Sequence, residues 1–218
     1  MFLLLLIPIF LKTWIEFFLD LLIVVLVALV IRSYVVIPFK VYGPSMCDTL
    51  NYYDGECHMG YGDRMLVNIF GYLRVGEFEV GAPKTNDIIV FSPSAVSQKF
   101  YVKRIIGVPG ETIRVKDGFV YKKQGAEFIK IDEFYLNQEN LGNTLLPGGQ
   151  TDLIYTVPQD HYFVLGDNRL HSTDSRNCFH TTFGQPCSAE SLSSFVSRDQ
   201  IKGKASLRFW PLKQFAKL

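Results

Sequence analysis

The hydrophobic positions of this 218-residue chain follow two different patterns. From Trp14 to Ile31 they form one run that only Glu16 and Asp20 interrupt. After Arg32 they come in short runs that Gly, Pro, Asn and Asp separate, and no long stretch has helical periodicity. The first pattern predicts a long apolar helix, and the second predicts a β-rich domain.

The apolar run is long enough to cross most of a bilayer core as a helix. Trp14 at one end and Arg32 at the other are residue types typical of membrane interfaces. A cleaved secretory signal peptide is the alternative, but the run is long and no small-x-small cleavage site follows it. We therefore expect a retained, single-pass membrane anchor. Residues 1–11 are also apolar and leave three alternatives: an interfacial segment, a longer helix, or an artefact of an upstream start site.

The short runs after the anchor predict strands, and one pair of runs predicts a hairpin. Asp117-Gly118 separates two β-branched and aromatic runs, and this dipeptide suits a type I′ turn. The predicted strands are Met65–Val67, Ile88–Phe91, Phe100–Val108, Ile113–Val115, Phe119–Tyr121, Leu153–Val157 and Tyr162–Leu165. The expected fold class is therefore mainly β: an antiparallel, barrel-like sheet behind an N-terminal transmembrane helix.

We divide the chain into three parts. Residues 1–31 form the apolar segment and anchor, residues 32–110 and 158–218 form a catalytic β-core, and residues 111–157 form an inserted, smaller β subdomain.

Composition limits the function classes. Lys and Arg number 22 against 21 Asp and Glu, so a broadly basic nucleic-acid-binding surface is not expected. The 14% aromatic content excludes a disordered chain.

Four cysteines lie in two loop-like segments rich in Gly, Asn and Asp. Their spacing favours the local pairs Cys47–Cys57 and Cys178–Cys187. Two alternatives stay open, free thiols and a metal site, although no C-x-x-C or zinc-type histidine spacing supports the metal. Disulfides form in oxidising compartments, which would place the domain on the outer side of the membrane.

Three polar elements carry candidate chemistry: Gly43-Pro44-Ser45-Met46, the strand around Lys103, and the stretch from Gly166 to Arg176. A serine hydroxyl needs an adjacent base, and a desolvated lysine can serve because burial lowers its pKa. The alternative for Ser45 is an ordinary turn residue. For Lys103 it is a solvent-facing side chain on an edge strand.

The order and spacing of these elements resemble the type I signal peptidases, the bacterial leader peptidase family of membrane-bound serine proteases with a Ser–Lys dyad. The matching sequences are G-P-S-M at 43–46, K-R-I-I-G-V-P-G-E at 103–111, G-D-N-R-L-H-S-T-D-S-R at 166–176 and F-W-P at 209–211. The resemblance implies an extracytoplasmic catalytic domain in the cell membrane that cleaves signal peptides of exported preproteins after small residues. It also implies no cofactor and no metal, and we expect a monomer that contacts the lipid bilayer.

The resemblance also implies roles for individual residues. Ser45 corresponds to the nucleophile, Lys103 to the general base and Ser172 to the serine that orients the lysine. The Ser45 N–H would be the main oxyanion donor; Gly43 stands where some members have a serine hydroxyl as second donor. An ion pair of Asp174 and Arg176 would brace the site. The implied pocket walls are Phe39, Val41, Leu50, Tyr101 and Val102, although apolar side chains of this kind are more often plain core.

The chain departs from the family pattern near the nucleophile. Where the family usually has proline two residues after the methionine, this chain has Asp48. The segments 51–61 and 177–194 are also longer than usual, and each expansion carries cysteines. Two rival interpretations are a self-cleaving repressor-type Ser–Lys protease and a non-catalytic, membrane-anchored β-domain that binds exported proteins.

Overall fold

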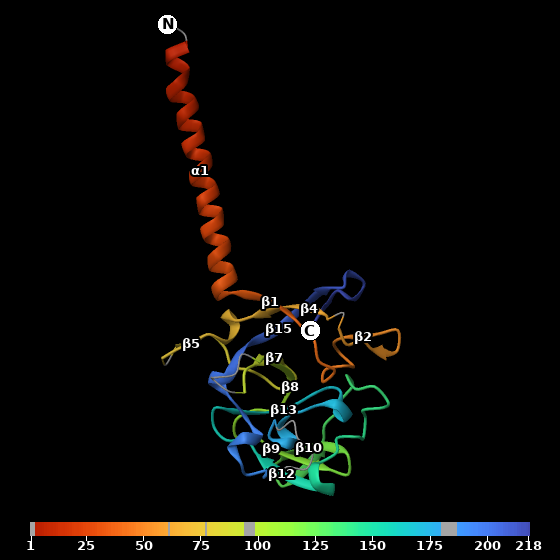
Figure 1. Cartoon of the computed structure of the whole chain (residues 1–218). Coiled ribbons are helices and arrows are strands. Elements are labelled where there is room, and N and C mark those ends of the chain that lie inside the picture. The colour runs from red at the N-terminus through yellow and green to blue at the C-terminus, as the bar shows by residue number, and fades with distance from the viewer. Residues whose placement is uncertain (1–2, 61, 77, 94–98, 180–186) are drawn as a thin grey trace.

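A computed structural model describes the whole chain except residues 1–2, 61, 77, 94–98 and 180–186. The helix α1 (Leu3–Tyr34) extends away from a β-rich body and meets it at β1 (Figure 1). Its 32 residues correspond to about 48 Å at the usual helical rise. The segment Lys12–Arg32 has the length and composition of a membrane span, and none of it is buried against the body. Residues 3–11 continue this helix, as in the alternative of a longer helix, while residues 1–2 lie outside the described residues.

Eight antiparallel strands form the main sheet. Their order is β1-β4-β15-β7-β8-β13-β14, and β16 pairs with the far end of β15. The bounds are β1 Val36–Lys40, β4 Arg64–Asn68, β7 Ile88–Phe91, β8 Tyr101–Gly107, β13 His161–Leu165, β14 Val196–Ser197, β15 Ile201–Trp210 and β16 Ala216–Lys217. The mainly-β, antiparallel fold class is thereby confirmed.

The main sheet is covered on both faces, and strand β7 shows why its sequence is a continuous apolar run. Ile88 and Val90 pack into one hydrophobic cluster, while Ile89 and Phe91 pack into another on the opposite face. A strand buried on both sides has no polar face, so its residues need not alternate. The first of these clusters also holds residues of the Ser45 loop and thereby anchors that loop to the sheet.

A second sheet of four strands follows β8. Its order is β11-β10-β9-β12, with bounds β9 Thr112–Lys116, β10 Phe119–Gln124, β11 Glu127–Lys130 and β12 Asp152–Thr156. Both residues of the predicted turn have positive φ, 49° at Asp117 and 82° at Gly118, as a type I′ turn requires. Val115 and Val120 of this sheet share a hydrophobic cluster with Phe163 of the main sheet. The division into a core and an inserted subdomain stays a prediction, because the two sheets share this core.

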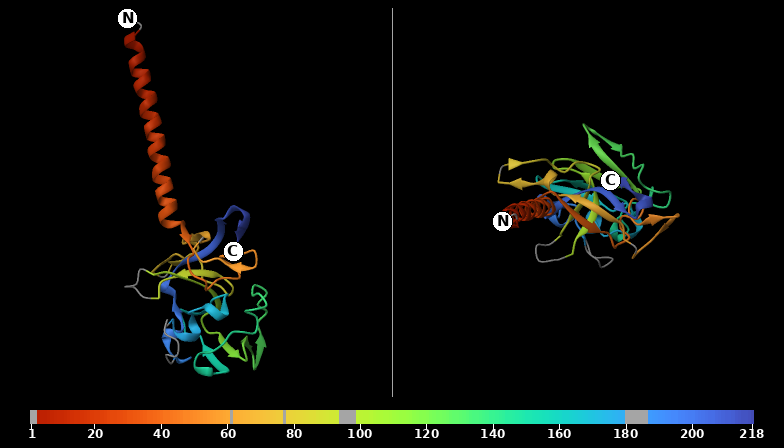
Figure 2. Two further views of the ribbon diagram at one scale, coloured as in Figure 1. Left: turned by 45° about the vertical axis from the view of Figure 1, so that its right-hand side comes forward. Right: turned by 90° about the horizontal axis from the view of Figure 1, so that it is seen from above.

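The second sheet lies at the end of the body opposite to α1 (Figures 1 and 2). Two small hairpins and several 3₁₀ turns complete the fold. The hairpins are β2 Tyr52–Tyr53 with β3 Glu56–Cys57, and β5 Arg74–Val75 with β6 Phe78–Glu79. The 3₁₀ turns are η1 Phe70–Tyr72, η2 Pro147–Gly149, η3 Arg169–His171, η4 Ser175–Asn177, η5 Leu192–Ser194, η6 Arg198–Gln200 and η7 Leu212–Gln214.

Every strand predicted from the sequence is present, but the longest strand was missed. Strand β15 contains Gly203, Ser206 and two lysines, and so lacks a strong apolar pattern. It is a strand because β7 and β4 pair with successive parts of it. These pairings join residues more than 100 positions apart, which local sequence patterns do not record.

Candidate active site

A tight turn after β1 presents Ser45. The Cys47 N–H donates to the Pro44 carbonyl at 2.9 Å, and the Leu50 N–H donates to the Met46 carbonyl at 2.8 Å. Met46 and Leu50 are buried against the main sheet. Two apolar anchors thus fix the loop, and Ser45 stays partly exposed at its start.

Lys103 lies in the middle of the main sheet. Its strand, β8, pairs with β7 on one side and β13 on the other, so the alternative of an edge-strand lysine is wrong. The Lys103 side chain is 2% exposed. Its Nζ lies 2.7 Å from Ser45 Oγ and donates to the Val102 carbonyl at 3.0 Å. The sheet and the turn therefore bring the two predicted dyad residues into hydrogen-bond contact.

The surroundings of Lys103 favour its neutral form. Burial lowers the pKa of Lys103 to about 8, since desolvation disfavours the ammonium. The charges of Asp174 and Asp167 oppose this shift, and that of Arg176 adds to it. No carboxylate of the described residues forms an ion pair with Lys103. A usable fraction of Lys103 is therefore neutral near physiological pH.

The segment after β13 closes the site from the other side. The Asn168 N–H donates to the Ser45 carbonyl at 3.1 Å. Gly166 is packed so closely that a Cβ would clash with the Ser45 carbonyl oxygen and with Ser172 Oγ. Ser172 Oγ is buried next to Asp174, and it helps to lower the pKa of that carboxyl. The structure places Ser172 beside the nucleophile loop, and its predicted bond to Lys103 stays a prediction.

Asp174 and Arg176 form a buried, two-pronged ion pair with both distances at 2.9 Å. Asp174 also accepts from the Gly166 N–H at 3.0 Å. Burial alone would raise the pKa of Asp174, but the Arg176 guanidinium and the Gly166 N–H outweigh it and hold that pKa below its usual value. The pair therefore stays charged and fixes the Ser172 loop.

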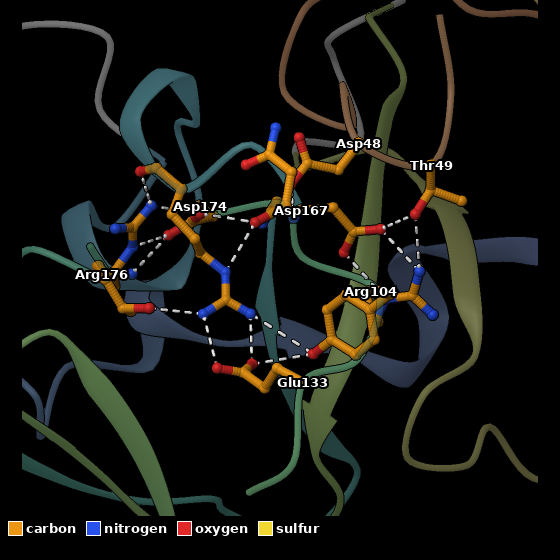
Figure 3. Close-up of polar contacts among 12 residues, drawn as sticks. Asp48, Thr49, Arg104, Glu133, Asp167, Asp174 and Arg176 are labelled. Carbon is orange, nitrogen blue, oxygen red and sulfur yellow. Dashed lines mark hydrogen bonds and ion pairs between the residues drawn. The ribbon is translucent and has the colours of Figure 1, made fainter. Parts of the chain in front are cut away.

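The bracing network is larger than the sequence reasoning proposed (Figure 3). Arg104 binds Asp167 through two bonds of 2.9 and 2.6 Å, and Asp167 accepts from Thr49 Oγ1 at 2.6 Å. Deeper in the body, Arg169 is paired with Glu133. Arg104, Asp167 and Arg169 all lie in the quoted motifs. The sequence signal for this network was the high number of charged residues in these motifs, because charged residues that become buried need partners of opposite charge.

A cavity of about 740 Å³ opens beside the dyad. Four of the five predicted pocket residues line it: Phe39, Val41, Tyr101 and Val102. Leu50 does not line this cavity, since its side chain is fully buried in the core, so the core alternative fits it better. The sequence reasoning did not name the lining residues Pro38, Lys40, Tyr42, Phe100, His171 and Thr173. They flank the named residues along β1, β8 and the Ser172 loop.

The cysteines join in the two local pairs that their spacing favours, Cys47–Cys57 and Cys178–Cys187. Cys47 lies two residues after Ser45 and is buried, while Cys57 is exposed on the β2–β3 hairpin. The first disulfide therefore connects the nucleophile loop to the expanded segment that follows it.

Comparisons with known proteins identify the family of the chain. The family model described as signal peptidase, peptidase S26, matches residues 14–210. Signal peptidase IB of Staphylococcus aureus (strain Mu50 / ATCC 700699) is 31% identical over 211 residues, covering 94% of this chain and 93% of that protein. Signal peptidase I of Bacillus caldolyticus is 36% identical over 198 residues, covering 88% and 89%.

A crystal structure of a signal peptidase I from Enterococcus faecalis V583 aligns with 57% of this chain and 97% of that chain, at 28% identity and a TM-score of 0.39. The family model and the two sequence relatives extend across both sheets and all three polar elements. The prediction of a serine peptidase is therefore confirmed, and the chain belongs to the signal peptidase family, peptidase S26.

Proposed function

We propose that this protein is a membrane-anchored endopeptidase that removes N-terminal signal peptides from exported preproteins, with Ser45 as nucleophile and Lys103 as general base. The observation that carries the proposal is the 2.7 Å contact between Ser45 Oγ and a buried lysine that has no carboxylate partner among the described residues. The relatives named signal peptidase I and IB support the substrate class.

The chemistry follows from that contact. Neutral Lys103 takes the proton of Ser45 Oγ, and the oxygen attacks the carbonyl carbon of the scissile peptide bond. The tetrahedral intermediate collapses when the Lys103 ammonium gives its proton to the leaving amine, which frees the mature protein. Lys103 then deprotonates a water molecule that attacks the acyl-enzyme ester, and the signal peptide leaves with a new carboxylate while Ser45 regains its proton.

The developing oxyanion needs hydrogen-bond donors. We assign the Ser45 N–H to this role, because it has no hydrogen-bond partner among the described residues. Gly43 provides no side-chain donor, although it lines the cavity beside Ser45. The site is thus built on one backbone donor where some family members would add a hydroxyl.

Two further assignments concern the walls and braces of the site. Phe39, Val41, Tyr101 and Val102 give the cavity apolar walls, which suits small apolar residues at the −1 and −3 positions of a signal peptide. Ser172 would orient Lys103, because its buried hydroxyl and the Ser45 carbonyl both pack against Gly166 at the site. The Asp174–Arg176 pair would hold the Ser172 loop.

The proposed location combines two observations. One apolar helix of suitable length precedes the catalytic body, which fits a single-pass anchor in the cell membrane. Two disulfides fit an oxidising environment, so the body would lie on the extracytoplasmic side. That the protein acts as a monomer stays a prediction from the resemblance. Protease accessibility of the full chain in intact cells tests the side: digestion of the body from outside supports it, and full protection contradicts it.

Cleavage of a preprotein by the full chain in lipid vesicles tests the function. We expect one cut after a small residue, lost in Ser45→Ala while substrate binding persists. The rival binding domain predicts binding without any cleavage by the unmodified protein. A self-cleaving protease predicts a cut within its own chain and no turnover of added preprotein.

A further inference from the structure

Asp48 sits three residues after Ser45, at the position where the family usually has proline. Its carboxylate faces the turn at residues 137–140, between β11 and β12. Oδ2 accepts from the Asn137 N–H at 2.9 Å, and Asn140 Nδ2 lies 3.0 and 3.1 Å from the two carboxylate oxygens. The side chain is half-buried, so these bonds are partly shielded from water.

Asn140 extends this contact to the other side of the active site. Its side chain is 2% exposed, and its Oδ1 accepts from the Leu170 N–H at 3.2 Å. Leu170 lies in η3, two residues before Ser172. A carboxylate and an amide therefore bridge the nucleophile loop to the Ser172 loop, and we call this contact the Asp48–Asn140 bridge. Figure 3 shows Asp48 on the nucleophile loop next to Thr49, which is bonded to Asp167 of the segment after β13.

We propose that Asp48 is a positioning residue that holds the nucleophile loop against the Ser172 loop through Asn140. The inference rests on the proposed roles of Ser45 and Lys103. Asp48 does not line the cavity, so its loss should change the rate of the chemical step more than the binding of substrate. Small displacements of a nucleophile are costly, because reacting atoms must be held in near-attack geometry.

The charges around Asp48 give the bridge a pH dependence. Burial raises the pKa of Asp48 to about 6, while the bonds from Asn137 and Asn140 oppose that shift. Two acidic groups face it, Asp167 from the segment after β13 and Glu139 from the 137–140 turn, and both raise the pKa further. Arg104 of β8 is committed to Asp167. Protonation of Asp48 removes one acceptor oxygen, so the bridge weakens below about pH 6.

The test uses preprotein cleavage by the full chain in lipid vesicles. Asp48→Ala and Asn140→Ala should each lower kcat about tenfold with KM nearly unchanged, and the double variant should lose little more than either single one. Asp132→Ala removes an exposed aspartate that has no ion pair with a described residue; it is the matched control and should cleave normally. Wild-type kcat in Asp48→Ala, or a double variant whose losses multiply, would overturn the proposal.

The pH profile separates positioning from a general loss of stability. Below about pH 6 the activity of the unmodified protein should fall more steeply than protonation of Lys103 alone explains, because Asp48 is protonated as well. Asp48→Asn should remove this additional fall. Glu139→Gln should move the step to lower pH. An identical acid limb in Asp48→Asn contradicts the inference. Ser45→Ala in the same assay keeps the two proposals apart: if it still cleaves, the proposed function fails, and if it is inactive while Asp48→Ala is normal, the positioning role alone fails.

Discussion

Lys103 and Arg104 are consecutive, buried residues of β8, and they differ in whether a carboxylate pairs with them. Arg104 is held by two bonds to Asp167 and donates a third to the Asn86 carbonyl at 3.0 Å. Lys103 contacts a hydroxyl and a carbonyl, and forms no ion pair with a described residue. One strand thus buries a paired cation and an unpaired amine next to each other.

The difference follows from the chemistry of the two side chains. A guanidinium stays charged at all physiological pH values, so its burial requires a counter-charge. A lysine can lose its proton instead, and the pKa of Lys103 is lowered to about 8. Between about pH 8 and the ordinary lysine value, the unfolded chain binds more protons than the folded one. Folding stability should therefore rise with pH through that window.

The largest effect should come from removing the amine. Lys103→Met preserves volume and Lys103→Arg preserves charge, yet both should lower cleavage by at least about 10⁴-fold, because neither can act as a base near neutral pH. Preprotein cleavage measures this, with the exposed Lys202→Met as the control that keeps activity. Substantial turnover by Lys103→Met would remove the lysine from the mechanism.

The second contrast concerns stability. Arg104→Met leaves Asp167 buried without its main partner and should lower the free energy of unfolding by about 3–5 kcal/mol. Lys103→Met removes an unpaired amine and should leave that free energy unchanged or higher. Denaturant unfolding of the full chain in detergent compares the two variants. Equal losses in both would mean that the two cations are buried in equivalent ways.

The two disulfides close loops of nearly equal length, with separations of 10 and 9 residues, so their effects on stability can be compared directly. Replacing either pair with serines should cost a similar free energy of unfolding, about 2–3 kcal/mol. Only the Cys47–Cys57 pair is covalently joined to the Ser45 turn, so its loss should also lower cleavage several-fold under conditions where the chain stays folded. Equal activity in both double variants would separate this disulfide from catalysis.

The smallest effect is expected at Gly43. A Cβ there would meet no described atom within 4 Å, so a serine fits without rearrangement. Gly43→Ser should supply a second oxyanion donor and raise kcat by roughly two- to tenfold, a fraction of what an optimally placed donor contributes. Gly43→Ala adds the carbon without the hydroxyl and should be neutral. The same rise in both variants would point to loop stiffening instead.

The sequence predicted what local patterns encode. The long apolar helix, seven strands and the Asp117-Gly118 turn could be read directly, and the motifs named Ser45 and Lys103, which the structure brings into contact. It could not predict that Arg104 would be paired with Asp167, 63 positions away, or that Asn137 and Asn140 would bond to Asp48. The first contact depends on the pairing of β8 with β13, and the other two depend on how the turn between β11 and β12 folds against the nucleophile loop. Leu50 was expected to line the pocket, but its side chain is fully buried in the core.

The central claim is that a neutral Lys103 activates Ser45, and the pH dependence of single-turnover cleavage tests it most directly. Burial lowers the pKa of Lys103 to about 8, so the proton that blocks the base leaves near that pH. With the enzyme in excess of substrate, at a concentration above KM, and with chemistry rate-limiting, cleavage by the full chain in lipid vesicles should rise about tenfold per pH unit between pH 6 and 7, rise less steeply up to pH 8 and level off above. A rate that stays flat from pH 6 to 10 would contradict the account.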